Sequence, residues 1–269
     1  METLELDGLR LAYWQEGRGQ PVVFVHGVGT SGELWARDIG PLARDRRLII
    51  YDRRGYGSSS KSPRDWRAHR NDAVALIEAL GAAPAVLVGY SDGSIIALDL
   101  ALERPDLVTA LVLLDPAFNL KRCLTPGFVR TLAAAQLLRR VGGERRGAEH
   151  WMRYVASYST GGSALDKAPA ERRERLLQNS TGIFDDFASG GGEHVDEARL
   201  ADIDVPVTII EAGLSPPFLR RSCERLKRLM PQAQTVTLAN SGHHVELDAA
   251  DELLGLLRQA TTAPAASPS

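Results

Sequence analysis

The chain has 269 residues, a length typical of one large domain or two small ones, and its 32 Lys and Arg residues against 34 Asp and Glu residues leave a formal charge of −2. This balance argues against a nucleic-acid-binding protein, which would need a cationic excess to meet phosphates. With 44% hydrophobic and 25% charged residues, the composition is that of a globular protein with a full core. No stretch approaches 18 consecutive apolar residues, so we expect no transmembrane helix and no membrane partner.

The two ends and the cysteines exclude further classes. The acidic start METLELDGLR has no basic region followed by an apolar block, so we expect no signal peptide. Cys123 and Cys223 have no CxxC spacing and no nearby His pair, which argues against a disulfide scaffold and against a zinc site. Two reduced thiols predict a cytoplasmic location.

Strands and helices alternate along the first part of the chain. Apolar runs predict strands at residues 9–15, 21–26, 47–52, 85–89 and 109–115, and helical spacing predicts helices at 65–80 and 94–103. The run VVFVH within 21–26 is apolar throughout, as is typical of a strand buried on both faces of a parallel sheet. This alternation with short links predicts the α/β class with a doubly wound parallel sheet.

The rhythm breaks after residue 115. Between 116 and about 204 we find no strand pattern, only helical patterns near 126–140, 144–159, 170–186 and 193–201 with glycine-rich links between them. Strands at 205–211 and 235–238 and helices at 218–230 and 245–259 follow. We therefore predict one α/β core from residues 1–115 and 205–260, a helical cap inserted at 116–204, and a disordered tail at 261–269.

The segment Gly89-Tyr90-Ser91-Asp92-Gly93 is a G-x-S-x-G motif between a predicted strand and a predicted helix, the context that a nucleophile elbow requires. A serine on this sharp turn projects its hydroxyl from the top of the sheet, and the glycines two positions before and after it relieve the crowding. The motif predicts that Ser91 is a nucleophile.

A glycine-rich turn, His26-Gly27-Val28-Gly29, closes the strand at 21–26. Such a turn can direct a backbone N–H at a developing oxyanion, so we predict the N–H groups of Val28 and Asp92 as the two oxyanion-hole donors. We interpret His26 as a brace for this loop rather than as a base.

The candidate base lies in Gly242-His243-His244, after the last predicted strand. A loop at the carboxyl edge of the sheet can reach Ser91, and the histidine comes last in the chain order of this hydrolase class. We prefer His243 to His244 because it directly follows the loop glycine.

Together these motifs resemble the α/β-hydrolase superfamily over nearly the whole chain. The residues that carry the resemblance are HGVGTSGELW (26–35), YDRRGYGSSS (51–60), GYSDGSIIAL (89–98) and NSGHHVELDAADEL (240–253). The third segment is similar to the GxSDGG variant of small bacterial esterases and valacyclovir-hydrolase relatives, with Ser94 in place of a glycine; the second also occurs in cofactor-free haloperoxidases and perhydrolases. The resemblance implies a mostly parallel eight-stranded sheet with a helical cap after strand six.

The position of the triad acid departs from the family pattern. The family usually places it after strand seven, where alignment from Pro206 puts Ser215, and a serine cannot stabilise an imidazolium as a carboxylate does. The end of strand six is the alternative place in the superfamily, so we prefer Asp115, which ends the strand at 109–115. Glu211 is the alternative acid, and a site with no conventional acid stays open.

Other residues receive secondary interpretations. Asp52 and Arg54 organise the turn in YDRRGYG, and the resemblance to valacyclovir-hydrolase relatives raises the option that the Asp92 side chain binds a cationic substrate group. Paired arginines such as 172–173 are read as solvated helix faces. Candidate apolar substrate-binding residues under the cap are Phe118, Trp151, Tyr154 and Phe184.

The sequence therefore favours a serine esterase or lactonase that cleaves a small, largely apolar carboxylic ester or lactone through an acyl-enzyme, without cofactor or metal, as a monomer or dimer. Two alternatives stay open. One is other chemistry on the same scaffold: perhydrolase or haloperoxidase-like, C–C hydrolysis, or a lyase step. The other is a ligand-binding or signalling protein with vestigial activity, for which the missing strand-seven aspartate is the support.

Overall fold

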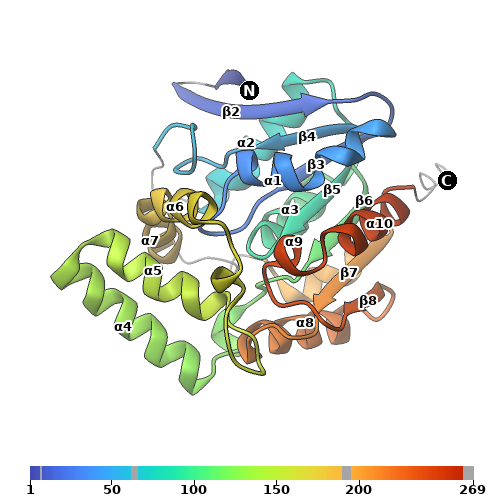
Figure 1. Ribbon diagram of the computed structural model, residues 1–269. Helices are drawn as coiled ribbons and strands as arrows, with labels where there is room; N and C mark the ends of the chain where they lie inside the picture. Colours follow the sequence, from blue (N-terminus) through green and yellow to red (C-terminus); the bar gives the residue numbers. More distant parts are fainter. Residues whose placement is uncertain (7, 62–65, 190–194, 263–269) are drawn as a thin grey trace.

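The computed structural model describes residues 1–6, 8–61, 66–189 and 195–262. Its centre is an eight-stranded sheet with the strand order β1-β2-β4-β3-β5-β6-β7-β8 (Figure 1). The strands from β3 to β8 run parallel to one another, while β1 and β2 add an antiparallel edge. Their bounds are β1 Glu2–Leu6, β2 Leu9–Glu16, β3 Pro21–Val25, β4 Arg47–Tyr51, β5 Ala85–Tyr90, β6 Val108–Leu114, β7 Val207–Ala212 and β8 Gln234–Leu238.

The mostly parallel eight-stranded α/β sheet is confirmed. Sequence analysis missed the edge strand β1, because its residues ETLEL mix charge with apolar groups and none of them is fully buried. By contrast, the central strand β5 is buried at every position, which explains why its apolar run was readable.

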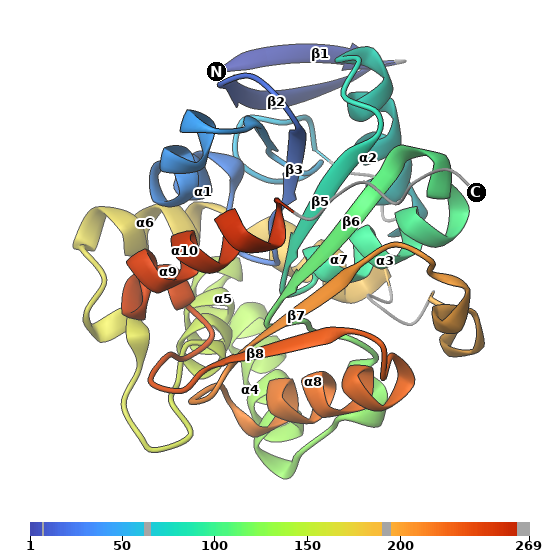
Figure 2. The same ribbon diagram turned by 90° about the vertical axis from the view of Figure 1, so that its right-hand side faces the viewer.

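Helices cover both faces of the sheet (Figure 2). On one face, α1 (Gly32–Ile39) and α10 (Ala250–Ala260) pack their apolar residues against the strands, and on the other face α2 (Trp66–Ala79), α3 (Gly93–Glu103) and α8 (Pro217–Leu229) do so. Two expectations were wrong in detail. The helix α1 was missed, and the predicted helix at 245–259 is two helices, α9 (Val245–Asp248) and α10, because Ala249 has an extended φ of −145°.

A helical insertion follows β6, as predicted. It contains α4 (Pro126–Gly142), α5 (Glu144–Val155), α6 (Ala170–Gln178) and α7 (Ser180–Ser189). The predicted helix at 170–186 breaks between α6 and α7 at Asn179, and the predicted helix at 193–201 is instead a 3-10 helix at Glu197–Asp202, with 193 and 194 outside the described residues. The expected disordered tail lies outside the described residues from 263 onward.

Candidate active site

Ser91 lies on a strained turn between β5 and α3. Its φ is +55°, a left-handed value that costs a non-glycine residue about 1–3 kcal/mol. The turn needs its glycines, since a Cβ on Gly89 would lie 2.5 Å from the carbonyl oxygen of Gly93, and one on Gly93 would lie 2.1 Å from that of Val25. Ser94, which replaces the glycine of the similar variant, fits because its hydroxyl donates to the Gly89 carbonyl at 2.7 Å.

Three side chains predicted as a triad meet at this turn. The Nε2 atom of His243 lies 3.0 Å from the Ser91 hydroxyl oxygen, and its Nδ1 atom lies 2.6 Å from Oδ2 of Asp115. All three residues are buried, with Ser91 the most exposed at 8%. Because a carboxylate only accepts hydrogen bonds, Nδ1 carries the proton and Nε2 is free to accept the hydroxyl proton of Ser91.

The carboxylate of Asp115 is held by donors from the neighbouring strand. The backbone N–H of Ala212 donates to Oδ1 at 3.1 Å, and the hydroxyl of Ser215 donates to Oδ2 at 2.6 Å. Ser215 is the residue at the usual acid position, so here the strand-seven side chain orients the strand-six acid. The alternative acid, Glu211, lies elsewhere, in an ion pair with Lys227.

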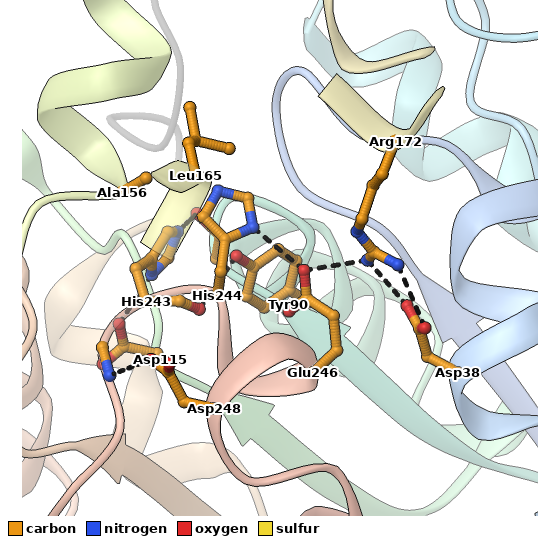
Figure 3. Close-up of polar contacts among 12 residues, drawn as sticks. Asp38, Tyr90, Asp115, Ala156, Leu165, Arg172, His243, His244, Glu246 and Asp248 are labelled. Atoms are coloured by element: carbon orange, nitrogen blue, oxygen red, sulfur yellow. Dashed lines mark hydrogen bonds and ion pairs between the residues drawn. The ribbon is translucent and has the colours of Figure 1, made fainter. Parts of the chain in front are cut away.

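The His243 loop is fixed from several sides. The ring of Tyr90 stacks on the His243 ring at 4.9 Å between centroids, and the Tyr90 hydroxyl donates to the His243 carbonyl at 3.0 Å. The next residue, His244, does not reach Ser91 but pairs through Nδ1 with Glu246 at 2.9 Å (Figure 3). Burial alone would raise the pKa of Glu246, but His244 and Arg172 lower it to about 2.

The cap contributes Arg172 to this loop. Its guanidinium donates to Oε1 of Glu246 at 2.9 Å and to both carboxylate oxygens of Asp38 at 3.1 and 2.7 Å (Figure 3). Sequence analysis read Arg172 as part of a solvated face, and this was wrong: its side chain is 12% exposed. Charge periodicity on α6 carried no signal for it, because both carboxylates come from the core helices α1 and α9.

The predicted oxyanion turn faces Ser91. A Cβ on Gly27 would lie 2.8 Å from Cβ of Ser91, so the turn approaches as closely as a glycine allows. His26 braces it through Nδ1 to the Gly27 carbonyl at 2.8 Å and through Nε2, which accepts the Arg53 N–H at 2.9 Å. In the described part of the chain we find no protein acceptor for the backbone N–H of Val28 or of Asp92.

A buried arginine that the sequence analysis passed over joins the cap to the elbow. Arg53 is fully buried and donates to Asp92 at 3.2 Å and to Asp186 of the cap helix α7 at 2.7 Å. Asp186 also accepts from Tyr56 at 2.6 Å and pairs with His69 at 3.0 Å.

The two carboxylates on Arg53 differ in ionisation. Burial raises the pKa of Asp92 to about 7, against the opposing charge of Arg53. Burial alone would also raise the pKa of Asp186, but Arg53 and His69 hold it below its usual value. Arg53 lies in YDRRGYG, where only its two neighbours had been read as structural; Asp52 does organise that turn, accepting from Gly32 at 2.7 Å and Ser58 at 2.8 Å.

A cavity of about 630 Å³ opens onto Ser91 beneath the cap. Apart from Ser91, His243, His244, Asp92, Asp186 and a few other polar groups, its wall is apolar and includes Phe128, Leu132, Trp151, Phe187 and Phe218.

Of the four substrate-binding candidates, only Trp151 lines this cavity. Phe118 is fully buried in the core of the sheet domain, Phe184 packs within the cap against Phe187, and Tyr154 stacks on the far side of Phe218. Apolar character predicted burial of these side chains but not the direction in which they face. Among the described residues no cluster of three His, Cys, Asp or Glu side chains is arranged to hold a metal ion, and no helix is long and apolar enough to cross a membrane.

Comparison with known proteins agrees with this architecture. Residues 20–250 match the model of the alpha/beta hydrolase fold family, and the chain belongs to this family. It is similar to an (E)-2-((N-methylformamido)methylene)succinate hydrolase of Acinetobacter baylyi, with 26% identity over 270 residues and 94% of each chain covered.

Solved structures resemble the chain over nearly its full length. An alpha/beta hydrolase from Sphaerobacter thermophilus is 26% identical with a TM-score of 0.76, covering 96% of this chain and 99% of that one. The enol-lactonase from Burkholderia xenovorans has a TM-score of 0.81 at 18% identity, covering 97% of this chain and 100% of that one, and shows the fold alone.

Proposed function

We propose that the chain is a serine hydrolase that cleaves a small, largely apolar carboxylic ester or lactone through an acyl-enzyme. The observation that carries the proposal is the continuous hydrogen-bonded line from the Ser91 hydroxyl through His243 to Asp115, at 3.0 and 2.6 Å. A vestigial binding protein would have no need to keep a strained serine aligned in this way at the bottom of a cavity.

In the proposed reaction, His243 takes the Ser91 proton as the hydroxyl oxygen attacks the carbonyl carbon. The N–H groups of Val28 and Asp92 hold the oxyanion, a role in which one donor is commonly worth about 3–4 kcal/mol. Protonated His243 then gives its proton to the departing alkoxide, and water activated by the same imidazole releases the acid. Asp115 holds the imidazole in the required tautomer and stabilises its cation.

The cavity wall favours an uncharged substrate. The wall beside Ser91 carries two carboxylates, Asp92 and Asp186, against the single guanidinium of Arg53, so a doubly anionic substrate would meet like charge. The A. baylyi relative is named for a succinate derivative. We therefore infer a different substrate here, with an apolar body that fills the aromatic wall and one reactive carbonyl.

The test uses purified protein with p-nitrophenyl acetate and a fluorophosphonate probe. We expect ester turnover and labelling of one serine, and loss of both in Ser91→Ala. Ser94→Ala is the matched control, because Ser94 is buried in the same turn without facing the cavity, and it should keep labelling and turnover. Unchanged hydrolysis in Ser91→Ala would contradict the proposal.

A substrate series then separates esters from lactones. We expect kcat/KM to rise along p-nitrophenyl esters until the acyl group fills the cavity of about 630 Å³, and to be low for substrates with a free carboxylate. Comparing lactones of the same carbon number by proton release tells which of the two bonds is preferred. A preference for dicarboxylates would contradict the inferred substrate class without touching the role of Ser91.

A further inference from the structure

The exposed apolar side chains of the protein are gathered in one place. Apart from Met1, every large hydrophobic side chain that is exposed in the described residues belongs to the cap segment 124–141: Leu124 at 43%, Val129 at 51%, Leu137 at 61% and Val141 at 72%. Single exposed apolar residues are ordinary on a protein surface, but their concentration on one segment marks an interaction surface.

Charge is segregated in the same segment. Residues 120–142 contain five cations and no Asp or Glu: Lys121, Arg122, Arg130, Arg139 and Arg140. The rest of the chain therefore carries a formal charge of −7, although the whole chain has only −2. The near-neutral total hides a basic cap segment on an acidic protein.

The apolar and basic residues share one side of α4. Val129, Ala133, Leu137 and Val141 recur every four residues and are all exposed. One residue turns a helix by 100°, so Arg140 lies between Val129 and Ala133 around the axis, and Arg130 lies between Leu137 and Val141. We call these six residues the α4 outer face. Figure 1 shows α4 at the outer edge of the cap, with α5 alongside it.

The α4 outer face continues into the mouth of the cavity. Val129 and Ala133 both belong to the cavity wall and are exposed, as is Leu124 just before the helix. The opposite side of α4, with Phe128 and Ala135, is buried in the cap core. The helix therefore presents its basic apolar side outward, at the entrance to the Ser91 site.

We propose that the α4 outer face docks onto an anionic lipid surface. An exposed helix face that combines apolar side chains with arginines is typical of helices that lie in the bilayer interface, where apolar groups enter the acyl boundary and arginines reach the headgroups. The absence of a membrane-spanning helix does not bear on this mode of binding, which needs no span. The expectation of no membrane partner was drawn from hydropathy and total charge, which do not register a one-sided helix.

A second copy of the chain fits this face less well. A two-fold contact would place the α4 outer face against itself, and Arg130 and Arg140 would meet their own copies without a carboxylate in the segment to compensate them. Arg139, which pairs with Glu144 at 3.1 Å, lies off this face and gives no such compensation.

The experiment is co-sedimentation of the full chain with phosphatidylcholine vesicles, with and without phosphatidylglycerol. We expect binding to the phosphatidylglycerol vesicles, weakened by added salt, and at least tenfold weaker binding to phosphatidylcholine alone. Leu137→Glu with Val141→Glu, and separately Arg130→Glu with Arg140→Glu, should each reduce binding at least tenfold. Hydrolysis of p-nitrophenyl acetate should be unchanged in both, because none of the four side chains lies near Ser91.

The control for the charge change is Arg18→Glu with Arg44→Glu, two exposed arginines at the amino-terminal end of the sheet. This variant has the same net charge as Arg130→Glu with Arg140→Glu and should keep vesicle binding. The proposal is overturned if the parent protein does not bind phosphatidylglycerol vesicles, or if the control loses binding equally. It is also overturned if light scattering shows a dimer that Leu137→Glu dissociates. Vesicle binding is measured without turnover, so its failure leaves the proposed catalysis untouched.

Discussion

The core and the cap contribute different things to the same site. The core supplies Ser91, Asp115 and His243 from the ends of neighbouring strands, all within 3.0 Å contacts. The cap supplies none of these groups but most of the apolar cavity wall. The core thus sets which chemistry is possible, and the cap sets which molecules reach it.

Two buried ion clusters join these regions, and they have opposite polarity. In one, Arg53 of the core grips Asp186 of the cap; in the other, Arg172 of the cap grips Asp38 and Glu246 of the core. Each cluster also includes a neighbour of the triad, namely Asp92 beside Ser91 or His244 beside His243. The docking of the cap and the alignment of the triad are therefore mechanically connected.

The largest effect is expected in the core. Asp115→Asn should lower kcat/KM about 10³- to 10⁴-fold, because an amide stabilises neither the required tautomer nor the imidazolium of His243. Steady-state hydrolysis of p-nitrophenyl acetate measures this. Glu211→Gln is the control, since Glu211 pairs with Lys227 instead, and it should stay within a few-fold of the parent. If Glu211→Gln were the severe variant, the acid assignment would be wrong.

The next effect concerns the junction. Arg53→Met should lower the free energy of unfolding by about 3–5 kcal/mol, because it leaves the buried Asp92 and Asp186 without their cation. Arg172→Met should cost less, about 1–3 kcal/mol, because this site is more exposed. Urea denaturation measures both.

The control for these two variants is an exposed pair. Arg153 and Asp166 are both more than half exposed, so Arg153→Met should change stability by less than about 1 kcal/mol. Equal costs at all three arginines would show that the buried clusters do not hold the cap.

A change confined to the cap wall should alter selectivity instead. Leu132→Trp narrows the cavity, so KM for bulky esters should rise about tenfold while acetate hydrolysis stays unchanged, because the loss of apolar contact is worth about 1–3 kcal/mol. Leu138→Trp, on the same helix but outside the cavity wall, should leave the ester profile unchanged. A similar loss for acetate would instead indicate damage to the triad.

The smallest effect is a pH dependence at the junction. Burial raises the pKa of Asp92 to about 7, so the folded state binds a proton that the unfolded state releases between its ordinary value near 4 and pH 7. This group therefore opposes folding increasingly as the pH rises through that window. Asp92→Asn removes the effect, so its Tm relative to the parent should increase by roughly 2–4 °C between pH 5 and 8. A constant difference across this range would exclude Asp92 as the titrating group.

Sequence patterns located what local structure determines. The apolar run before Gly89 and the helix after Gly93 identified the elbow at Ser91, and the βα rhythm identified the sheet and the insertion. What they missed depends on partners distant in sequence. Arg53 meets Asp186 across 133 residues and Arg172 meets Asp38 across 134, and no periodicity encodes such a contact.

The sequence by itself determined the hydrolase fold, the elbow and the order of the candidate residues, because backbone sterics and hydrophobic periodicity act over a few neighbours. Only the tertiary structure decided which carboxylate meets His243: three strands end at one edge, Asp115 points to the imidazole, and Ser215 fills the place of the usual acid. It likewise decided which aromatic side chains face the cavity and where the cations of a near-neutral chain gather. Those outcomes depend on the packing of distant segments, which composition and spacing average away.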